Sequence, residues 1–337
     1  MDFTLAVNAR FRFRRTSGVE RYAHEISARL KMPKRFIAPS RPLGQAAGHL
    51  WEQFVLPVLL HKTEMLWSPA NAGAWMVQRQ AVTIHDASVF DHPEWFRSHF
   101  AAWTRLSWRI LAKRAKAILT VSEFSKHRLK RHLGISDGKI CVVHNGVAKP
   151  FEPQPQKRIQ AVKEKYGIKK AYFLFVGTLE PRKNFSTLLQ AWQTANLRAH
   201  ELFIAGAEGK VFAPVTVRVS NTTFIPDEDL PALYSGAAAF VFPSLYEGFG
   251  LPVLEAMACG APVVTSNTTA LAELFGDSAL LVAPDKPEEI AQAMQTILED
   301  NSLAGSLRER GLKKAGELTW ETSAMKTEEI LKSTGAY

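Results

Sequence analysis

Short runs of β-branched and aromatic residues alternate with longer amphipathic stretches along the whole chain, which is the pattern of βα units around a parallel sheet. In the first half the runs predict strands at residues 3–9, 65–68, 81–85, 117–121 and 140–144. The second half restarts the alternation at residues 172–177, 202–205, 222–225, 239–242, 262–265 and 279–282. The expected fold class is therefore α/β, with two doubly wound parallel-sheet domains.

A proline-rich segment separates the two series of strands. Residues 149–158 read KPFEPQPQKR, and the three prolines can neither continue a helix nor donate hydrogen bonds to a central sheet. We expect this segment to be the interdomain linker. The 337 residues of the chain suffice for two domains of about 150 residues each.

The net charge of +10 is concentrated in the first half of the chain. Residues 1–150 hold 24 Lys and Arg against 10 Asp and Glu, which gives +14, while residues 151–337 hold 18 against 22, which gives −4. The first half is thus expected to meet an anionic partner. Nucleic acid, an anionic membrane surface and a phosphorylated substrate all stay open at this point.

Cysteine content and hydrophobic runs narrow the class of protein. Cys141 and Cys259 are too far apart in sequence for a disulfide framework or a zinc cluster, so a reducing cytosol is expected. The first residues carry no apolar region typical of a secretory signal. No run approaches the roughly 18 apolar residues needed to span a bilayer. We expect a soluble or peripheral protein.

Ligands of open parallel sheets bind outside the carboxyl ends of the strands, so the residues after each predicted strand are the candidates for chemistry. After the first strand, Gly18 opens a helix, where a phosphate can approach free backbone N–H groups. An ordinary loop capped by Ser17 is the alternative. His85 is the last residue of the strand at 81–85, and Asp86 follows it. For His85 a role in the site and a structural role are equally open. Ser122 or Ser125 is expected to be a structural helix cap.

In the second half, Gly177 ends a strand and is followed by Arg182 and Lys183, just before a helix with Asn184 as its expected cap. Cations beside helix-terminal N–H groups make a surface that binds a diphosphate. A solvated pair of basic residues is the alternative.

Two glutamates follow the strand at 239–242. Glu247 lies in a loop with Gly248, and Glu255 comes eight residues later, inside a helix predicted to start near Gly250. Carboxylates accept hydrogen bonds from vicinal hydroxyls. The combination suits a nucleotide sugar, with one glutamate on the transferred sugar, one on the ribose, and the cations on the diphosphate between them.

These segments, together with SGVERY, TIHD, VSEFS, VHNGV, GTLEPRKN and PSLYEGFGLPVLEAMACGAPVV, resemble the retaining glycosyltransferases of the large GT-B family 4 over nearly the whole chain. Glu247 and Glu255 meet the E-x7-E signature of that family. The resemblance implies two Rossmann-like domains that face each other across a cleft. The implied domains are residues 1–150 on the acceptor side, residues 151–317 on the donor side, and a helix in residues 318–337 that crosses back to the first domain.

The resemblance also implies roles for individual residues. Gly18 would approach the donor diphosphate, and His85 the donor sugar near the reaction centre. Glu247 would bond sugar hydroxyls and Glu255 would hold the ribose. The backbone that supports the sugar would be that of Phe249, Gly250 and Leu251.

One position departs from the family pattern. Many members carry an arginine directly after the strand-end glycine, whereas Thr178 follows Gly177 here. Lys183 matches the family lysine on the diphosphate, and Arg182 is the candidate for the missing charge.

The activity implied by the resemblance is transfer of a hexose, with mannose or rhamnose favoured, from a nucleotide-diphospho-sugar with retention at the anomeric carbon. The acceptor would be a glycan or a polyprenyl-diphosphate-linked glycan in cell-surface polysaccharide or lipopolysaccharide synthesis, at the inner face of the cytoplasmic membrane. No cofactor and no metal is expected, because no DxD-like pair ends a strand. The alternatives are another GT-B enzyme, such as a phosphorylase or a sugar-nucleotide epimerase, and a nucleic-acid-binding protein. Nucleic acid is not expected as a partner, because no recognisable RNA- or DNA-binding module is present.

Residues 93–116 interleave aromatic rings with cations, which favours the interface of an anionic bilayer. The alternative is an amphipathic helix that packs on its own domain, with Trp103 and Leu106 in the core.

Overall fold

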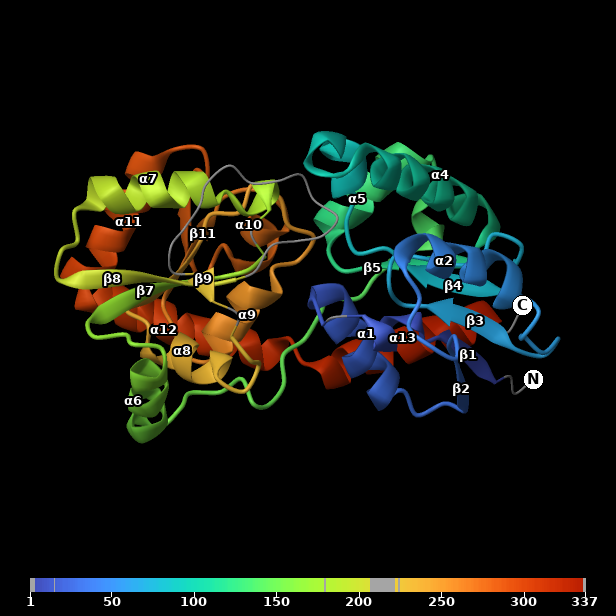
Figure 1. Cartoon of the computed structure of the whole chain (residues 1–337), viewed down its shortest axis with the longest axis horizontal. Coiled ribbons are helices and arrows are strands. Elements are labelled where there is room, and N and C mark those ends of the chain that lie inside the picture. The colour runs from blue at the N-terminus through green and yellow to red at the C-terminus, as the bar shows by residue number, and fades with distance from the viewer. Residues whose placement is uncertain (1–3, 15, 179, 207–221, 224, 336–337) are drawn as a thin grey trace. The chain divides into compact units, whose positions relative to one another are not determined.

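The computed structural model describes residues 4–14, 16–178, 180–206, 222–223 and 225–335. Contacts divide the chain into two compact units (Figure 1). Unit 1 comprises Met1–Asp91, Ser98–Asn145 and Trp320–Tyr337, and unit 2 comprises His92–Arg97 and Gly146–Thr319. The domain boundaries inferred at residues 150 and 317 stay predictions, and each unit is described by itself.

Unit 1 is built on a six-stranded parallel sheet with the order β2-β1-β3-β4-β5-β6. Ala6 sets the register, since it lies opposite Arg35 of the second strand and Leu66 of the third. The inner strands are buried along their whole length, which is why they appear in the sequence as continuous apolar runs. The strands are β1 (Leu5–Asn8), β2 (Lys34–Ile37), β3 (Met65–Ser68), β4 (Gln80–Thr83), β5 (Ala117–Thr120) and β6 (Ile140–Val142).

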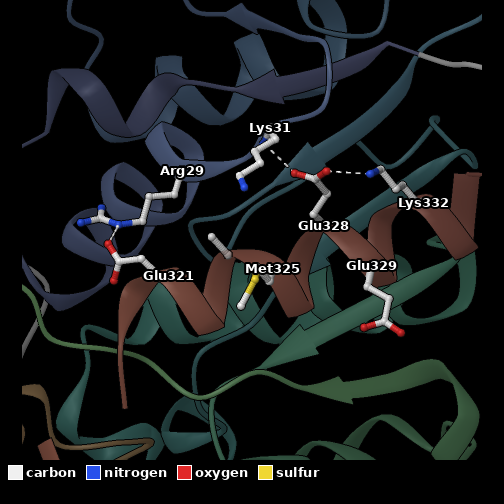
Figure 2. Close-up of a pocket in the computed structure, with 8 residues that line it drawn as sticks. Arg29, Lys31, Glu321, Met325, Glu328, Glu329 and Lys332 are labelled. Carbon is white, nitrogen blue, oxygen red and sulfur yellow. Dashed lines mark hydrogen bonds and ion pairs between the residues drawn. The ribbon is translucent and has the colours of Figure 1, made fainter. Parts of the chain in front are cut away.

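Six α-helices belong to this unit: α1 (Gly18–Arg29), α2 (Gln45–Leu50), α3 (Ser88–Asp91), α4 (Ser98–Arg114), α5 (Glu123–Leu133) and α13 (Trp320–Gly335). Helix α5 begins as predicted, because the Ser122 hydroxyl accepts a hydrogen bond from Ser125 N. Helix α13 packs beside α1, and Arg29 Nε donates to Glu321 Oε1 at 2.7 Å. Glu328 accepts from the backbone N–H groups of Lys31 and Met32, and these contacts surround a surface pocket between the two helices (Figure 2).

Unit 2 repeats the architecture with a six-stranded parallel sheet in the order β12-β11-β10-β7-β8-β9. The strands are β7 (Ala171–Val176), β8 (His200–Ala205), β9 (Thr222–Thr223), β10 (Ala239–Phe242), β11 (Val263–Ser266) and β12 (Leu280–Val282). The helices are α6 (Gln156–Lys165), α7 (Phe185–Ala195), α8 (Leu230–Gly236), α9 (Leu251–Ala258), α10 (Thr269–Phe275), α11 (Pro287–Glu299) and α12 (Asn301–Glu317).

The α/β class and the two parallel sheets are confirmed, with two local corrections. Strand β2 was not predicted, because its four residues form an edge strand in which only Ile37 is buried. The predicted linker at 149–158 is too long, since α6 already begins at Gln156 with Pro155 as its N-cap residue. A proline at that position costs the helix no hydrogen bond, so it does not delay the start. Position 3 of the first predicted strand lies outside the described residues.

Helix α4 decides in part between the alternatives for residues 93–116. Trp108 and Leu111 are buried, as a helix packed on its own domain requires. Trp103 is half-buried, whereas Leu106 is 51% exposed, so the prediction that Leu106 belongs to the core is wrong. The expected contact of this segment with an anionic bilayer stays a prediction.

The order of the strands fixes where each sheet can bind a ligand. In unit 2 the chain runs outward from β7 through β8 to β9, and then places β10 on the other side of β7. The order of strands thus reverses at β7 and β10, and the carboxyl ends of strands at such a reversal are where open parallel sheets bind their ligands. In unit 1 the same reversal occurs between β1 and β3.

Candidate active site

A cluster of charged side chains lies where β7 and β10 end. Glu180, Arg182 and Lys183 follow β7 in a loop that contains a short helical turn, Pro181–Lys183, and Ser244 and Glu247 follow β10. The backbone N–H of Leu245 donates to the Arg182 carbonyl at 2.7 Å, which ties the two loops together. The structure thus brings the two sequence motifs to one end of one sheet, at the reversal of strand order.

Glu247 is the centre of the cluster and is only 6% exposed. Its Oε1 accepts from Lys183 Nζ at 2.5 Å and from Ser244 Oγ at 2.7 Å, and its Oε2 accepts from Arg182 Nη1 at 3.0 Å. Burial alone would raise the pKa of Glu247, but the charges of Arg182 and Lys183 and these hydrogen bonds lower it. The carboxylate is therefore ionised at neutral pH and held in one orientation.

Lys183 is equally enclosed, at 5% exposure, and its ammonium lies 4.6 Å from the centre of the Phe242 ring. Burial and the neighbouring Arg182 lower the pKa of Lys183, although Glu247 opposes that shift. The alternative interpretation of residues 182–183 as a solvated basic pair is wrong for Lys183, because its side chain is buried.

Glu180 completes the cluster, with its carboxylate 2.5 Å from Arg182 Nε. Burial raises the pKa of Glu180, against the opposing charges of Arg182 and Lys183. Two carboxylates and two cations therefore share one enclosed volume. An incoming anion would meet both cations, each already oriented by a carboxylate, and could compete with Glu247 for them.

The positions around these charges differ in how strictly the structure constrains them. Gly177 has room for a side chain, since a Cβ added there would meet its nearest neighbour, Phe175, at 3.6 Å. Thr178 is exposed, and position 179 lies outside the described residues. In the described part of this loop the positive charge near Glu247 comes from Arg182 and Lys183.

Helix α9 starts where the sequence predicts. Gly250 is its N-cap residue with φ +101°, and a Cβ added there would come within 2.6 Å of Leu271 Cδ2, so glycine is required on both counts. Phe249 lies edge-on to Phe275, with ring centres 6.0 Å apart, and Leu251 is the first helical residue. The loop that carries Glu247 is therefore fixed at its far end.

Glu255 lies in the middle of α9 and is 6% exposed. Its Oε2 accepts a hydrogen bond from the Tyr234 hydroxyl of α8 at 3.2 Å. The two glutamates of the E-x7-E pattern thus have different partners, since Glu247 bonds two cations and Glu255 bonds a phenol.

In unit 1, His85 follows β4 and is 7% exposed. Its Nε2 lies 3.0 Å from the Pro69 carbonyl, and its ring meets Tyr22 edge to face at 4.7 Å. Burial lowers the pKa of His85, against the effects of the Pro69 carbonyl and Asp86, so the ring is neutral at neutral pH. The Asp86 carboxylate accepts from the Ser88 backbone N–H and hydroxyl and thereby begins α3.

Gly18 is the first residue of α1, one turn before Tyr22, which contacts His85. Ser17 occupies the N-cap position, but its hydroxyl donates to the carboxylate of Glu20 instead of capping the helix backbone. The alternative interpretation, an ordinary loop capped by the Ser17 side chain, is wrong in this respect.

Asn184 occupies the N-cap position of α7 as predicted, but its side chain does not cap the helix backbone. Its backbone is left-handed, at φ 57°, and its side-chain N–H groups donate to the carbonyls of Pro243 and Pro284. The Thr187 hydroxyl donates to Asn184 Oδ1 at 2.6 Å. This residue therefore connects loops instead of capping α7.

Sequence reasoning missed Glu180, Ser244 and Thr269, although each contacts the cluster. Ser244 Oγ donates to Glu247, Thr269 Oγ1 accepts from the Glu247 backbone N–H at 3.3 Å, and Glu180 pairs with Arg182. Two of the three lie inside motifs that the sequence analysis quotes, Glu180 in GTLEPRKN and Ser244 in PSLYEGFG, and that position was the available signal. Within the described ranges, no group of three His, Cys, Asp or Glu side chains is arranged to hold a metal ion, and none of the described helices is long and apolar enough to cross a membrane.

Comparison with known protein families gives two matches that together cover most of the chain. The family described as Glycosyl transferases group 1 matches residues 157–314, and the one described as Glycosyltransferase Family 4 matches residues 57–149. The O-antigen chain mannosyltransferase B of Escherichia coli is 35% identical over 264 residues, which is 74% of this chain and 69% of that protein. The O-antigen chain mannosyltransferase RfbU of Salmonella typhimurium strain LT2 is 28% identical over 230 residues, 66% of this chain and 62% of its own length.

Solved structures with the same fold include Alr3699/HepE of Anabaena in complex with UDP and glucose. Its TM-score is 0.76 at 16% identity, and the match covers 99% of this chain and 100% of that one. WaaG, a glycosyltransferase involved in lipopolysaccharide biosynthesis, matches with a TM-score of 0.72 at 17% identity, over 97% of this chain and 99% of that one. The two parallel sheets are thus those of the GT-B fold.

Proposed function

The chain belongs to the group 1 glycosyltransferases, and from this premise we propose that it transfers a hexose, with mannose favoured over rhamnose, from a nucleotide-diphospho-sugar to a growing cell-surface glycan. The choice of mannose and of an O-antigen or lipopolysaccharide acceptor is supported by the names of the relatives. The alternatives, a phosphorylase, an epimerase or a nucleic-acid-binding protein, are not favoured by any observation.

One observation carries the proposal: an ionised glutamate is held by a buried lysine and an arginine at the strand-order reversal of unit 2. In this proposal Lys183 and Arg182 bind the donor diphosphate. Arg182 supplies the positive charge that many family members place at the position of Thr178. Glu247 accepts hydrogen bonds from the hydroxyls of the transferred sugar, and Glu255 from those of the ribose. The backbone of Gly177, Phe249, Gly250 and Leu251 lines the donor, while Gly18 and His85 of unit 1 approach the diphosphate and the sugar.

The proposed reaction retains configuration at the anomeric carbon. The bond from that carbon to the diphosphate oxygen breaks, the acceptor oxygen bonds the carbon from the same face, and the acceptor proton passes to the departing diphosphate. Arg182 and Lys183 would stabilise the negative charge that develops on the leaving group, each contributing about 3 kcal/mol in an enclosed site. Because these cations are provided by the chain, we propose that no divalent ion and no cofactor is required.

We further propose that the enzyme works in the cytoplasm, at the inner face of the membrane, on a glycan linked to a polyprenyl diphosphate. The excess of cations in the first half of the chain supports an anionic membrane surface as a partner.

The proposal is tested by incubating the enzyme with GDP-, UDP- and dTDP-hexoses and a soluble mannose-terminated oligosaccharide. We expect transfer from one nucleotide sugar, with an α-linked product when the donor is α-linked, and an unchanged rate in excess EDTA. Absence of transfer from every donor would contradict the proposed function. A rate that EDTA abolishes and Mg²⁺ restores would contradict the metal-free mechanism alone.

Replacing Lys183 should separate its role from that of Arg182. We expect Lys183→Ala to weaken binding of the donor and of the free nucleoside diphosphate by about tenfold or more, because both share the charged contact to the diphosphate. The nucleoside monophosphate should lose less. Titration calorimetry gives the three affinities, and Lys286→Ala, an exposed lysine paired with Glu289, is the matched control. Equal losses for the mono- and diphosphate would place Lys183 away from the β-phosphate.

A further inference from the structure

Thr269 has a left-handed backbone, which is an unusual conformation for a β-branched residue. Its φ is 61°, and it is the first residue of α10, directly after the N-cap residue Thr268. The other described residues with a left-handed backbone are glycines and asparagines, which adopt it at lower cost. A β-branched side chain crowds the backbone in this region, so the conformation costs free energy and persists only where the surrounding structure fixes it.

The packing of α10 fixes this conformation. Leu271 and Phe275 of the helix are fully buried, and Leu271 lies so close to Gly250 that a Cβ added there would come within 2.6 Å of it. The helix is thus packed against the loop that follows Glu247, and Thr269 turns the chain from β11 into that helix. For the turn alone glycine would be the less strained residue. The turn therefore does not explain the threonine side chain.

What threonine adds at this position is a hydroxyl group bonded to the backbone of Glu247. Thr269 Oγ1 accepts a hydrogen bond from the Glu247 backbone N–H at 3.3 Å, and the Ala270 backbone N–H donates to the Glu247 carbonyl at 3.4 Å. Both backbone groups of Glu247 are thus held by the first two residues of α10. Contacts on either side of one Cα atom restrict rotation about φ and ψ, so they set the direction in which the side chain of Glu247 leaves the backbone.

The contact belongs to a series of three hydroxyl groups that hold the segment after β10. The three bonds join Thr265 Oγ1 to the Phe242 carbonyl at 2.9 Å, Ser266 Oγ to the Ser244 carbonyl at 2.7 Å, and Thr269 Oγ1 to the Glu247 N–H. Strand pairing between β10 and β11 ends at Phe242, and Pro243 has no N–H to continue it. Side-chain hydroxyls therefore take over from the backbone ladder, and the last of them reaches Glu247.

The backbone contacts differ from the other contacts of Glu247 in their relation to the donor. In the proposed function Lys183 and Arg182 bind the diphosphate, which then competes with the Glu247 carboxylate for both cations. The bond from Ser244 Oγ and the contacts from α10 do not involve the cations. They are the contacts that still direct Glu247 when the diphosphate is bound.

We propose that Thr269 is a positioning residue of the candidate site: its hydroxyl fixes the Glu247 backbone, so that the carboxylate keeps its direction toward the sugar while the two cations bind the diphosphate. This inference rests on the proposed function, since the sugar and the diphosphate are those of the donor. Thr269 acts through Glu247 and does not itself touch the donor.

The test is Thr269→Val, which keeps the branched shape and removes only the hydroxyl. We expect kcat to fall about tenfold with donor and acceptor both saturating, because the Glu247 N–H loses its acceptor and the carboxylate its fixed direction. The affinities for GDP, UDP and dTDP, measured by titration calorimetry, should equal those of the wild type, since these ligands carry no sugar to be transferred. Thr269→Ser keeps the hydroxyl and should stay within about twofold of the wild-type kcat.

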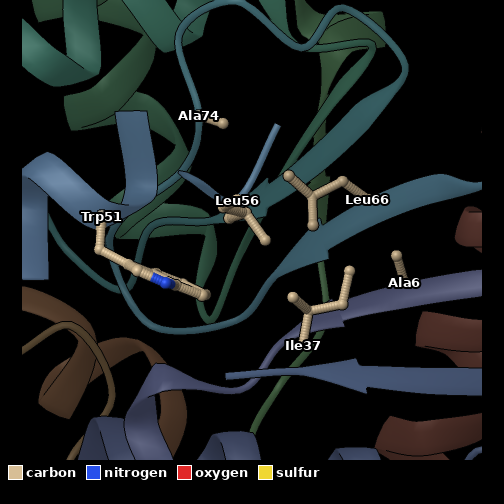
Figure 3. Packing of buried hydrophobic residues seen from close by; sticks show 6 residues of the cluster. All are labelled: Ala6, Ile37, Trp51, Leu56, Leu66 and Ala74. Carbon is tan, nitrogen blue, oxygen red and sulfur yellow. The ribbon is translucent and has the colours of Figure 1, made fainter. Parts of the chain in front are cut away.

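Two controls separate positioning from a general loss of stability. Thr296→Val removes an exposed hydroxyl that donates to the Gln292 carbonyl within α11 at 2.9 Å. Ile37→Val shortens a side chain that packs with Trp51 and Leu66 in the core of unit 1 (Figure 3), so it lowers the stability of the protein at a distance from Glu247 in the fold. Both control variants should keep the wild-type kcat.

Two further measurements show whether Thr269 acts through Glu247. In Glu247→Ala there is no carboxylate to direct, so Thr269→Val should cost no further turnover in that background. Hydrogen exchange of a peptide that contains Glu247, followed by mass spectrometry, reports on the backbone contact without any substrate. We expect faster exchange in Thr269→Val and wild-type exchange in Thr269→Ser.

Each of three results would overturn the inference. These are a wild-type kcat in Thr269→Val, the same fold loss when Thr269→Val is added to Glu247→Ala, and unchanged hydrogen exchange of the peptide that contains Glu247. If the wild type showed no transfer from any donor, the proposed function would fail, and the exchange experiment would still decide whether Thr269 holds the Glu247 backbone.

Discussion

Glu247→Gln should lower kcat by about 10²-fold with donor and acceptor both saturating, because hydrogen bonds to the sugar hydroxyls strengthen as the sugar becomes cationic in the transition state. The substitution keeps the shape of the side chain but removes the charge that Lys183 and Arg182 share. Steady-state kinetics on the purified enzyme gives kcat, and the stronger variant Glu247→Ala should lose at least as much.

The loss must come from chemistry and not from unfolding. In the variant Lys183 keeps the carboxylate of Glu180 as an opposite charge nearby, and the Gln side chain can still accept its hydrogen bond, so we expect the folded state to persist, as thermal denaturation can confirm. Glu299→Gln, at the exposed end of α11, is the matched control and should leave kcat unchanged. A folded Glu247→Gln enzyme with wild-type turnover would exclude the proposed role.

The largest effect on stability is expected from Glu52→Ala in unit 1. Glu52 is 1% exposed and Arg10 is 6% exposed, so the substitution leaves an arginine charge without a partner in the core. Burial, opposed by Glu52, already lowers the pKa of Arg10 to about 10. Removal of one member of such a pair costs about 3–5 kcal/mol of unfolding free energy.

Urea denaturation followed by tryptophan fluorescence measures this loss. The double variant Arg10→Met/Glu52→Leu should recover most of the stability, because removal of both charges also removes the unpaired one. A Glu52→Ala protein as stable as the wild type would mean that Arg10 reaches solvent in solution.

Sequence patterns predicted the sheets well because buried parallel strands consist of continuous apolar runs. Residues 239–242 and 65–68 were predicted with their observed bounds. Strand β2 has no such run, because it lies at the sheet edge and only Ile37 is buried. Its formation depends on pairing with β1, which is a tertiary contact that local composition does not encode.

The candidate site was predicted in part. Arg182, Lys183 and Glu247 were identified from residue type and position, and the structure brings them into direct contact across 64 or 65 positions of sequence. Glu180 was not identified although it lies inside the GTLEPRKN motif, because its role depends on burial and on pairing with Arg182, which are tertiary contacts. Local sequence also did not predict which face of the helix at residues 50–59 is buried. That face contains Glu52, which pairs with Arg10, a residue distant in sequence.

The Asn184 side chain orders the candidate site during folding. Its two N–H groups bind the carbonyls of Pro243 and Pro284, so one side chain fastens together the loops that leave β7, β10 and β12. Arg182 and Lys183 directly precede this fastening, and their positions are settled while the chain folds. The two side chains therefore lose their conformational entropy on folding and not on donor binding. More of the binding free energy of the donor can then be used to distort the sugar toward the transition state.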